Sequence, residues 1–229
     1  GGNYNVVVGD EAGTALTTGD KNVAIGFEAL KTEDAHGDNV AVGYQALKTL
    51  NAGADGFNVA VGYQAGLNVT TAVNNTIIGA LAGDALTTGN ENVAVGFEAL
   101  STEDGHGGNV AVGSAALKAQ DAGAAAFNTG VGYNAGLSVT TGIRNTLMGG
   151  EAGDALTDAD DNVAIGALAL SGDTLGSQSV AIGRGALKVQ NFTTATSTYN
   201  VAVGYSAGEL VTTGTQNTLI GGLAGDALT

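Results

Sequence analysis

Short apolar segments with alternating side chains recur along the whole chain. Residues 39–47 read NVAVGYQAL, and close copies of this stretch occur thirteen times between residues 1 and 229. Within each copy, valine or isoleucine usually occupies alternate positions, as at Val40 and Val42. A period of two is typical of a β-strand. Each copy therefore predicts one short strand, and a glycine follows it.

The spacing of these glycines, called marker glycines here, predicts how the strands are arranged. Most successive marker glycines are 17 residues apart, and three intervals are longer, at 19 or 21 residues. A fixed period with insertions confined to the gaps is typical of a solenoid. Parallel stacking would place the strands ~4.8 Å apart. We therefore predict an all-β fold, a parallel β-solenoid of about 13 coils of 17–21 residues, forming a single domain over 1–229. The marker glycines are Gly9, Gly26, Gly43, Gly62, Gly79, Gly96, Gly113, Gly132, Gly149, Gly166, Gly183, Gly204 and Gly221.

A longer period is superimposed on the coils. Four coil types follow one another and then return after 70 or 72 residues, and we call this four-coil unit the super-repeat. One coil type has a bulky residue at the centre of its strand, namely Val7, Ile77, Leu147 or Leu219. No change of composition separates the units, which supports a single domain.

Most other strand centres are alanine, and this pattern predicts contact with a second chain. If valine and isoleucine point into the coil, the alanine face points outward and remains apolar. A strand that is apolar on both faces is usually buried on both faces. We therefore expect neighbouring chains to pack along the alanine face around a rotation axis. The predicted interface residues are Ala24, Ala41, Ala60, Ala94, Ala111, Ala164, Ala181 and Ala202.

Asparagine precedes the strand in twelve of the thirteen coils, and Ser179 replaces it once. Stacked amides can hydrogen-bond along the axis, and asparagine tolerates turn conformations. A ladder along the axis is thus the favoured interpretation, and a ligand-binding row of amides is the alternative. The marker glycine itself predicts a bend or a close backbone approach at the end of each strand.

Composition and charge narrow the possible partners. The chain has 39 glycines, no cysteine, no proline and only 11 aromatic residues, which suits a thin interior. Its net charge of −15 argues against nucleic acid and against anionic membrane surfaces. No apolar stretch is long enough to cross a bilayer. Because the chain begins without methionine and stops partway through a coil, we expect it to be an excerpt of a longer fibre protein.

The repeat resembles those of two families of fibrous proteins. Residues 22–29 read NVAIGFEA, which is similar to the S-V-A-I-G-x-x-A repeat of trimeric autotransporter adhesin heads and to repeats of bacteriophage tail fibres. The resemblance covers essentially the whole chain, but the coils are longer and asparagine replaces the usual serine. It implies a left-handed β-roll, wound intertwined or side by side into a homotrimer. It also implies an extracellular location, on a virion tail fibre or a bacterial cell surface.

Candidate chemistry is sparse. Glu33, Asp34, His36 and Asp38 form a group that a divalent metal could use, although a solvated corner is the favoured interpretation. The acidic residues recur with the repeat, whereas a glycosidase site must break it. We therefore expect no enzyme activity and no cofactor.

Aromatic residues follow several marker glycines and suggest one further possibility. Stacking on sugar rings would suit exposed aromatics, and shielding of a groove between chains is the favoured alternative. The candidates are Tyr44, Tyr63, Tyr133 and Tyr205. The expected function is a rigid segment of an extracellular fibre that attaches to a host or surface. A carbohydrate-binding surface along the rod is the alternative, with a glycan or a protein as receptor.

Overall fold

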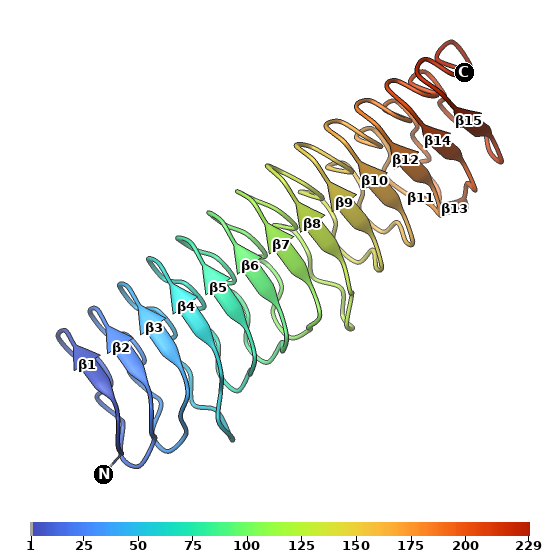
Figure 1. The fold of residues 1–229 in the computed structure, drawn as a ribbon. Coiled ribbons are helices and arrows are strands. Elements are labelled where there is room, and N and C mark those ends of the chain that lie inside the picture. The colour runs from blue at the N-terminus through green and yellow to red at the C-terminus, as the bar shows by residue number, and fades with distance from the viewer. Residues whose placement is uncertain (1) are drawn as a thin grey trace.

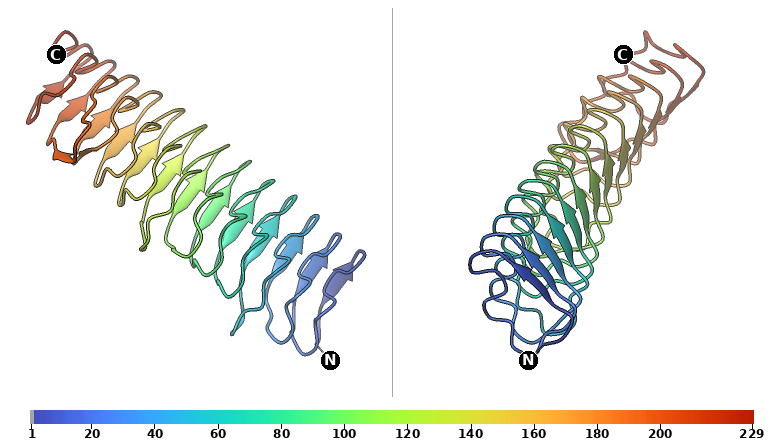
Figure 2. Two further views of the ribbon diagram at one scale, coloured as in Figure 1. Left: turned by 180° about the vertical axis from the view of Figure 1, so that it is seen from behind. Right: turned by 60° about the vertical axis from the view of Figure 1, so that its left-hand side comes forward.

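The computed structural model describes residues 2–229, which form a long, regularly coiled rod with the two termini at opposite ends (Figures 1 and 2). Thirteen strands form one sheet in chain order, and β11 and β13 form a second, two-stranded sheet. No helix occurs within these residues. The strands are β1 (Val6–Val8), β2 (Val23–Ile25), β3 (Val40–Val42), β4 (Val59–Val61), β5 (Thr76–Ile78), β6 (Val93–Val95), β7 (Val110–Val112), β8 (Thr129–Val131), β9 (Thr146–Met148), β10 (Val163–Ile165), β11 (Gly176–Ser177), β12 (Val180–Ile182), β13 (Thr196–Ser197), β14 (Val201–Val203) and β15 (Thr218–Ile220).

Neighbouring strands are parallel and in register, which confirms the predicted solenoid. Val40 pairs with Val59, for example, although a 19-residue interval separates them. Backbone hydrogen bonds also join successive coils away from the strands, as from Gly13 N–H to the Ala29 carbonyl at 2.9 Å. A three-residue strand is too short to be stable alone, so the bonds around the whole coil are needed to hold it.

The interior of the coil is the reverse of the one expected from the sequence. The strand-centre alanines, from Ala24 to Ala202, are fully buried inside the single chain. The valines and isoleucines on either side of them point outward and are partly exposed. The alanine row is therefore not an interface with another chain, and that prediction is wrong.

Leucines from the opposite wall of the coil explain the reversal. Leu47, Leu100 and Leu117, each four residues after a marker glycine, are fully buried. They leave room for only a small side chain at the strand centre. At Gly130, a methyl group would lie 2.8 Å from Leu117 Cγ, closer than real contacts allow. The volume of the facing side chain thus decides which side of the strand is inside.

The super-repeat follows from the same constraint. Where the strand centre is large, as at Ile77 and Leu147, the residue four after the marker glycine is glycine, Gly83 or Gly153. A methyl group at Gly153 would lie 2.7 Å from Leu147 Cδ2. Large and small residues thus exchange places across these coils. Where both positions are small, as at Gly130 and Gly136, Leu117 and Leu147 of the two adjacent coils fill the space.

The marker glycines allow successive coils to touch through their backbones. Gly113 has φ +137°, and a methyl group there would lie 2.3 Å from the carbonyl oxygen of Gly132 in the next coil. Only glycine fits both the backbone angle and the space. The predicted close approach at the end of each strand is confirmed.

The asparagines form a ladder inside the rod, as expected. The backbone N–H of Asn145 donates to Asn128 Oδ1 at 2.8 Å, and the N–H of Asn162 donates to Asn145 Oδ1 at 3.0 Å. The side-chain amide of Asn145 also donates to the carbonyl of Ala159 at 2.7 Å. The backbone N–H and the side chain of Asn145 thus connect its coil to both neighbouring coils.

The ladder changes where serine replaces asparagine. Ser179 lies 2.6 Å from Thr198 Oγ1, and its hydroxyl accepts a hydrogen bond from Gln190 at 2.9 Å. The small sheet of β11 and β13 leads into this region, with Gly176 paired to Thr196. Other side chains and an added strand pair thus take over the contacts of the missing amide.

The inward position of Ala111 can be tested by exchanging volume across the coil. Ala111→Leu should lower the free energy of unfolding by about 1–3 kcal/mol through overpacking. Adding Leu117→Gly should restore much of this loss, because the pair then copies Leu147 and Gly153. Urea denaturation monitored by circular dichroism measures both effects. Ala124→Leu, at an exposed corner, is the control, and equal stability of the two leucine variants would contradict an inward alanine.

The ladder can be tested at Asn145. Replacement by alanine leaves the Asn162 N–H and the Ala159 carbonyl without partners, and each lost partner costs about 1–3 kcal/mol when buried. We expect Asn145→Ala to lower the stability by roughly 2–4 kcal/mol. Asn51→Ala removes an exposed amide and should change little. Similar midpoints for the two variants in chemical denaturation would argue against the ladder as a source of stability.

Candidate functional site

The outer side of the long sheet is a surface of uniform chemistry that runs along the rod. We call this surface the valine face, and it consists of the first and third residue of each of the thirteen strands of that sheet. All 26 positions are valine, isoleucine, threonine or methionine, and none is charged, although the chain carries 29 charged residues. Most are partly buried by their neighbours along the sheet, and Ile25, Ile78 and Met148 are 36%, 39% and 41% exposed. The result is a continuous, uncharged apolar strip along the rod.

Aromatic side chains border this strip where the strands end. Phe27, Tyr44 and Tyr63 stack on one another, with ring centroids 5.3 and 5.2 Å apart. Tyr44 thus has a ring on each side, and no free face of that ring remains for a sugar. Tyr133 is 59% exposed, and the Arg184 guanidinium lies 5.9 Å from the centroid of Tyr205. These contacts favour a role in which the aromatic rings line the edge of the apolar strip. They do not form a continuous row of free rings on which sugars could stack.

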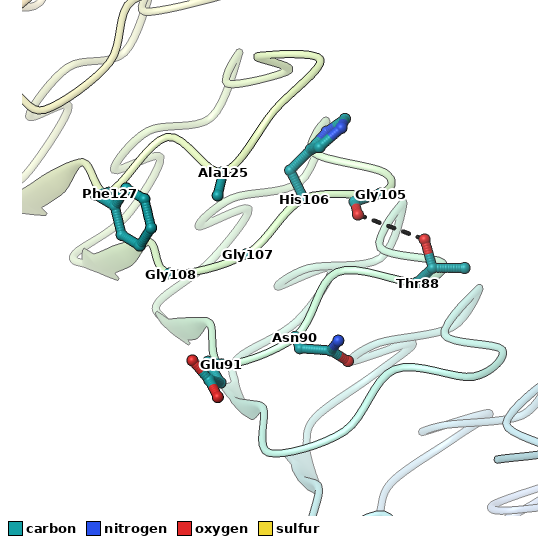
Figure 3. Close-up of a pocket in the computed structure, with 9 residues that line it drawn as sticks. All are labelled: Thr88, Asn90, Glu91, Gly105, His106, Gly107, Gly108, Ala125 and Phe127. Carbon is teal, nitrogen blue, oxygen red and sulfur yellow. Dashed lines mark hydrogen bonds between the residues drawn. The ribbon is translucent and has the colours of Figure 1, made fainter. Parts of the chain in front are cut away.

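A shallow depression of about 340 Å³ lies near the other edge of the strip, across three coils (Figure 3). Its floor consists largely of glycine, and the Phe127 ring stands at one side with Asn90 and Glu91 at the other. At Gly108 the floor has no side chain, and a methyl group there would lie 2.7 Å from the Phe127 ring, whereas Asp38 and Gln178 occupy the equivalent positions of the other super-repeats. The lining residues are Thr88, Asn90, Glu91, Gly105, His106, Gly107, Gly108, Ala125 and Phe127.

The predicted metal candidates are only partly brought together. Glu33, Asp34 and His36 have possible ligand atoms within 4.8 Å of one another. Asp38 is not part of this group and lies 3.5 Å from Lys21 Nζ instead. Both Glu33 carboxylate oxygens accept backbone hydrogen bonds, from His36 and Ala52, each at 3.1 Å. Glu33 therefore shapes the corner of the coil.

A related group in the second super-repeat has one more acidic residue. Glu103, Asp104, His106 and Asp121 have possible ligand atoms within 4.8 Å of one another. Asp121 comes from the following coil, and sequence reasoning missed it because its partners are 15 to 18 residues away. A comparison of the super-repeats could have indicated Asp121, because asparagine stands at the equivalent positions 51 and 191.

Charged side chains form a small network in the first coils. Glu28 accepts hydrogen bonds from Lys31 and Gln45, and Lys48 Nζ lies 2.7 Å from its Oε2 atom. Lys31, Lys48 and Gln45 lower the pKa of Glu28 to about 2. Lys31 also contacts Glu11 of the preceding coil. These pairs join neighbouring coils at the surface, and they offer no arrangement of acid, base and nucleophile.

The part of the chain that the structure describes contains no helix long and apolar enough to cross a membrane. No protein-family model, curated protein or solved structure matches the chain. The valine face, its aromatic border, the depression and the acidic corners are therefore the features from which a function must be inferred.

Proposed function

We propose that this chain is a rigid segment of an extracellular fibre, in which three copies pack together through their valine faces. The fibre would serve attachment to a host or surface, as the resemblance to adhesin heads and phage tail fibres implies. The observation that carries the proposal is the uncharged apolar strip, which runs along the rod from β1 to β15.

The form of the single chain supports a structural role. Thirteen coils stack in constant register, and a buried amide ladder and backbone hydrogen bonds connect them around the coil. A solenoid of this kind contacts only its neighbours along one axis, so its length increases with the number of repeats. The fold is therefore well suited to spacing and stiffening.

The size of the valine face supports association. Thirteen strands spaced by ~4.8 Å, each three residues wide, give a footprint of roughly 600 Å². Stable protein interfaces bury about 800 Å² per partner, and the aromatic border extends the strip toward that value. A net charge of −15 makes an uncharged strip along the whole rod unusual. An uncharged apolar surface of this length favours burial against other chains.

A three-fold arrangement uses every part of this surface. Three rods pointing in one direction would turn their valine faces toward a common axis and enclose them. The aromatic border would then lie at the seams between chains, where large rings can cover the edge of an apolar core. This arrangement keeps the trimer predicted from the sequence and assigns it to different residues.

The interface can be tested with a single charge. The unmodified chain should sediment with three times the 22.2 kDa mass of one chain. Val112→Glu should shift it to monomers without loss of the β-sheet circular dichroism signal, because three carboxylates would meet near the axis. Ala124→Glu adds the same charge at an exposed corner and should leave the mass unchanged. A monomeric or dimeric parent chain would overturn the trimer.

A second function, carbohydrate binding, is favoured by the depression beside Phe127. The ring is 63% exposed and lies against Gly108, which has no side chain to cover the floor. Asn90, Glu91 and Thr88 supply polar groups around it. An aromatic face combined with amide, carboxylate and hydroxyl groups suits a sugar ring, which is apolar on one face and has hydroxyls at its edge.

Glycan-array binding tests this second function. Phe127→Ala should weaken any glycan signal at least tenfold because the stacking face is lost. Gly108→Asp should also remove it, since it restores the residue found at position 38 and fills the floor. Phe57→Ala, at the equivalent site of the first super-repeat, is the matched control. A well-folded rod without any glycan signal, or an equal loss with Phe57→Ala, would rule out the depression as the site.

A further inference from the structure

We propose that Glu103, Asp104, His106 and Asp121 form a binding site for a divalent transition-metal ion such as Zn²⁺. The four side chains come from the corners that follow β6 and β7, so the ion would join two successive coils. The site does not involve the valine face of the proposed trimer, and it shares His106 with the lining of the depression.

The first support is an unsatisfied oxygen in a buried side chain. The Glu103 side chain is fully buried, and its Oε1 atom accepts a hydrogen bond from the His106 N–H at 3.0 Å and lies 3.2 Å from Nδ1 of that ring. Its Oε2 atom is buried and has no hydrogen-bond partner. A buried carboxylate oxygen without a donor or a cation is costly.

The two sister corners show that this is a particular property of the second super-repeat. Both oxygens of Glu33 accept hydrogen bonds from backbone N–H groups. In the third super-repeat, both oxygens of Asp173 also have donors, including the Gln190 amide at 2.6 Å. The equivalent amide of Gln120 donates to the Thr140 carbonyl at 2.9 Å instead. Glu103 alone among these three acids has lost a donor.

The second support is the charge at position 121. Asparagine occupies the equivalent positions 51 and 191, whereas Asp121 brings a third carboxylate to Glu103 and Asp104. Three carboxylates in one place repel one another unless a cation lies between them. The second super-repeat therefore differs from the other two in two ways. Its buried Glu103 has an oxygen without a hydrogen-bond donor, and its position 121 carries a negative charge.

The geometry and ligand types fit a zinc-like ion. In tetrahedral coordination, two ligands of one Zn²⁺ ion lie about 3.4 Å apart, given bonds of about 2.0–2.2 Å. The four ligand atoms already lie within 4.8 Å, and the exposed Asp104 and Asp121 can move closer by rotation. One imidazole with carboxylates favours zinc over calcium, which prefers oxygen alone. The imidazole of His106 is therefore the ligand that favours a zinc-like ion over calcium at this site.

Calorimetric titration of the 229-residue chain with Zn²⁺ tests the site, and thermal unfolding gives a second readout. We expect one Zn²⁺ per chain, a rise of the unfolding midpoint with Zn²⁺, and a Zn²⁺-dependent shift of the His106 ring signals by NMR. Asp121→Asn should weaken binding at least tenfold and abolish the rise of the midpoint. This variant copies the residue at positions 51 and 191, so the fold should accept it.

Asp34→Asn is the matched control, because it removes the same charge from the first super-repeat. It should leave Zn²⁺ binding by the chain unchanged. Equal losses with Asp34→Asn and Asp121→Asn, or no Zn²⁺ binding at millimolar concentration, would overturn the proposed site. Equal affinity for Ca²⁺ and Zn²⁺ would overturn the role of His106 as a ligand.

Discussion

The hydrogen bond from one strand to the asparagine of the preceding coil is the constraint on which the rod depends. It keeps the same form whether 17 or 19 residues separate the two asparagines, as the bonds at Asn75 and Asn58 show at 3.0 and 3.2 Å. Insertions can therefore enlarge a corner without changing the register of the strands. The ladder thus separates the repeating frame of the molecule from corners that are free to vary.

This frame also holds the backbone in conformations that are otherwise unfavourable. Leucines such as Leu47 and Leu117 have φ +47°, in the left-handed region that most side chains avoid. Each such residue costs about 1–2 kcal/mol. At Leu47, the N–H bonds to the Ala65 carbonyl at 3.1 Å and the side chain fills the core, so burial and hydrogen bonding offset the strain. The tight left-handed turns are what bring the far wall close enough to leave only alanine-sized space.

Much of the fold could be predicted from the sequence, because its signals are local and repeated. Strand positions, marker glycines and the amide ladder each follow from a residue type that recurs at the same place in nearly every coil. The inner and outer faces could not be assigned from hydrophobicity, since Val40 and Ala41 are both apolar. The deciding signal was the exchange of volume between positions such as Ile77 and Gly83, which becomes meaningful only when the two are known to face each other.

The candidate sites were harder to predict for a related reason. The depression depends on Gly108 lying beneath Phe127, and the acidic corner depends on Asp121 lying beside Glu103. Both are contacts between successive coils, and a sequence read along one coil does not show them. Comparison of equivalent positions in the three super-repeats would have indicated both, because Gly108 and Asp121 are departures from the residues found there in the other two.

The valine face and the corners follow different physical rules, and this difference supports the two kinds of function proposed. Each coil adds about 50 Å² of apolar strip, worth roughly 1 kcal/mol when buried. The contribution of one coil is too small for association, but it adds up along thirteen coils of constant chemistry. A corner gains nothing from repetition, because a binding site needs a particular set of side chains only once. Variation is therefore tolerated at the corners, where Gly108 and Asp121 occur, whereas the outward strand positions remain apolar or threonine throughout.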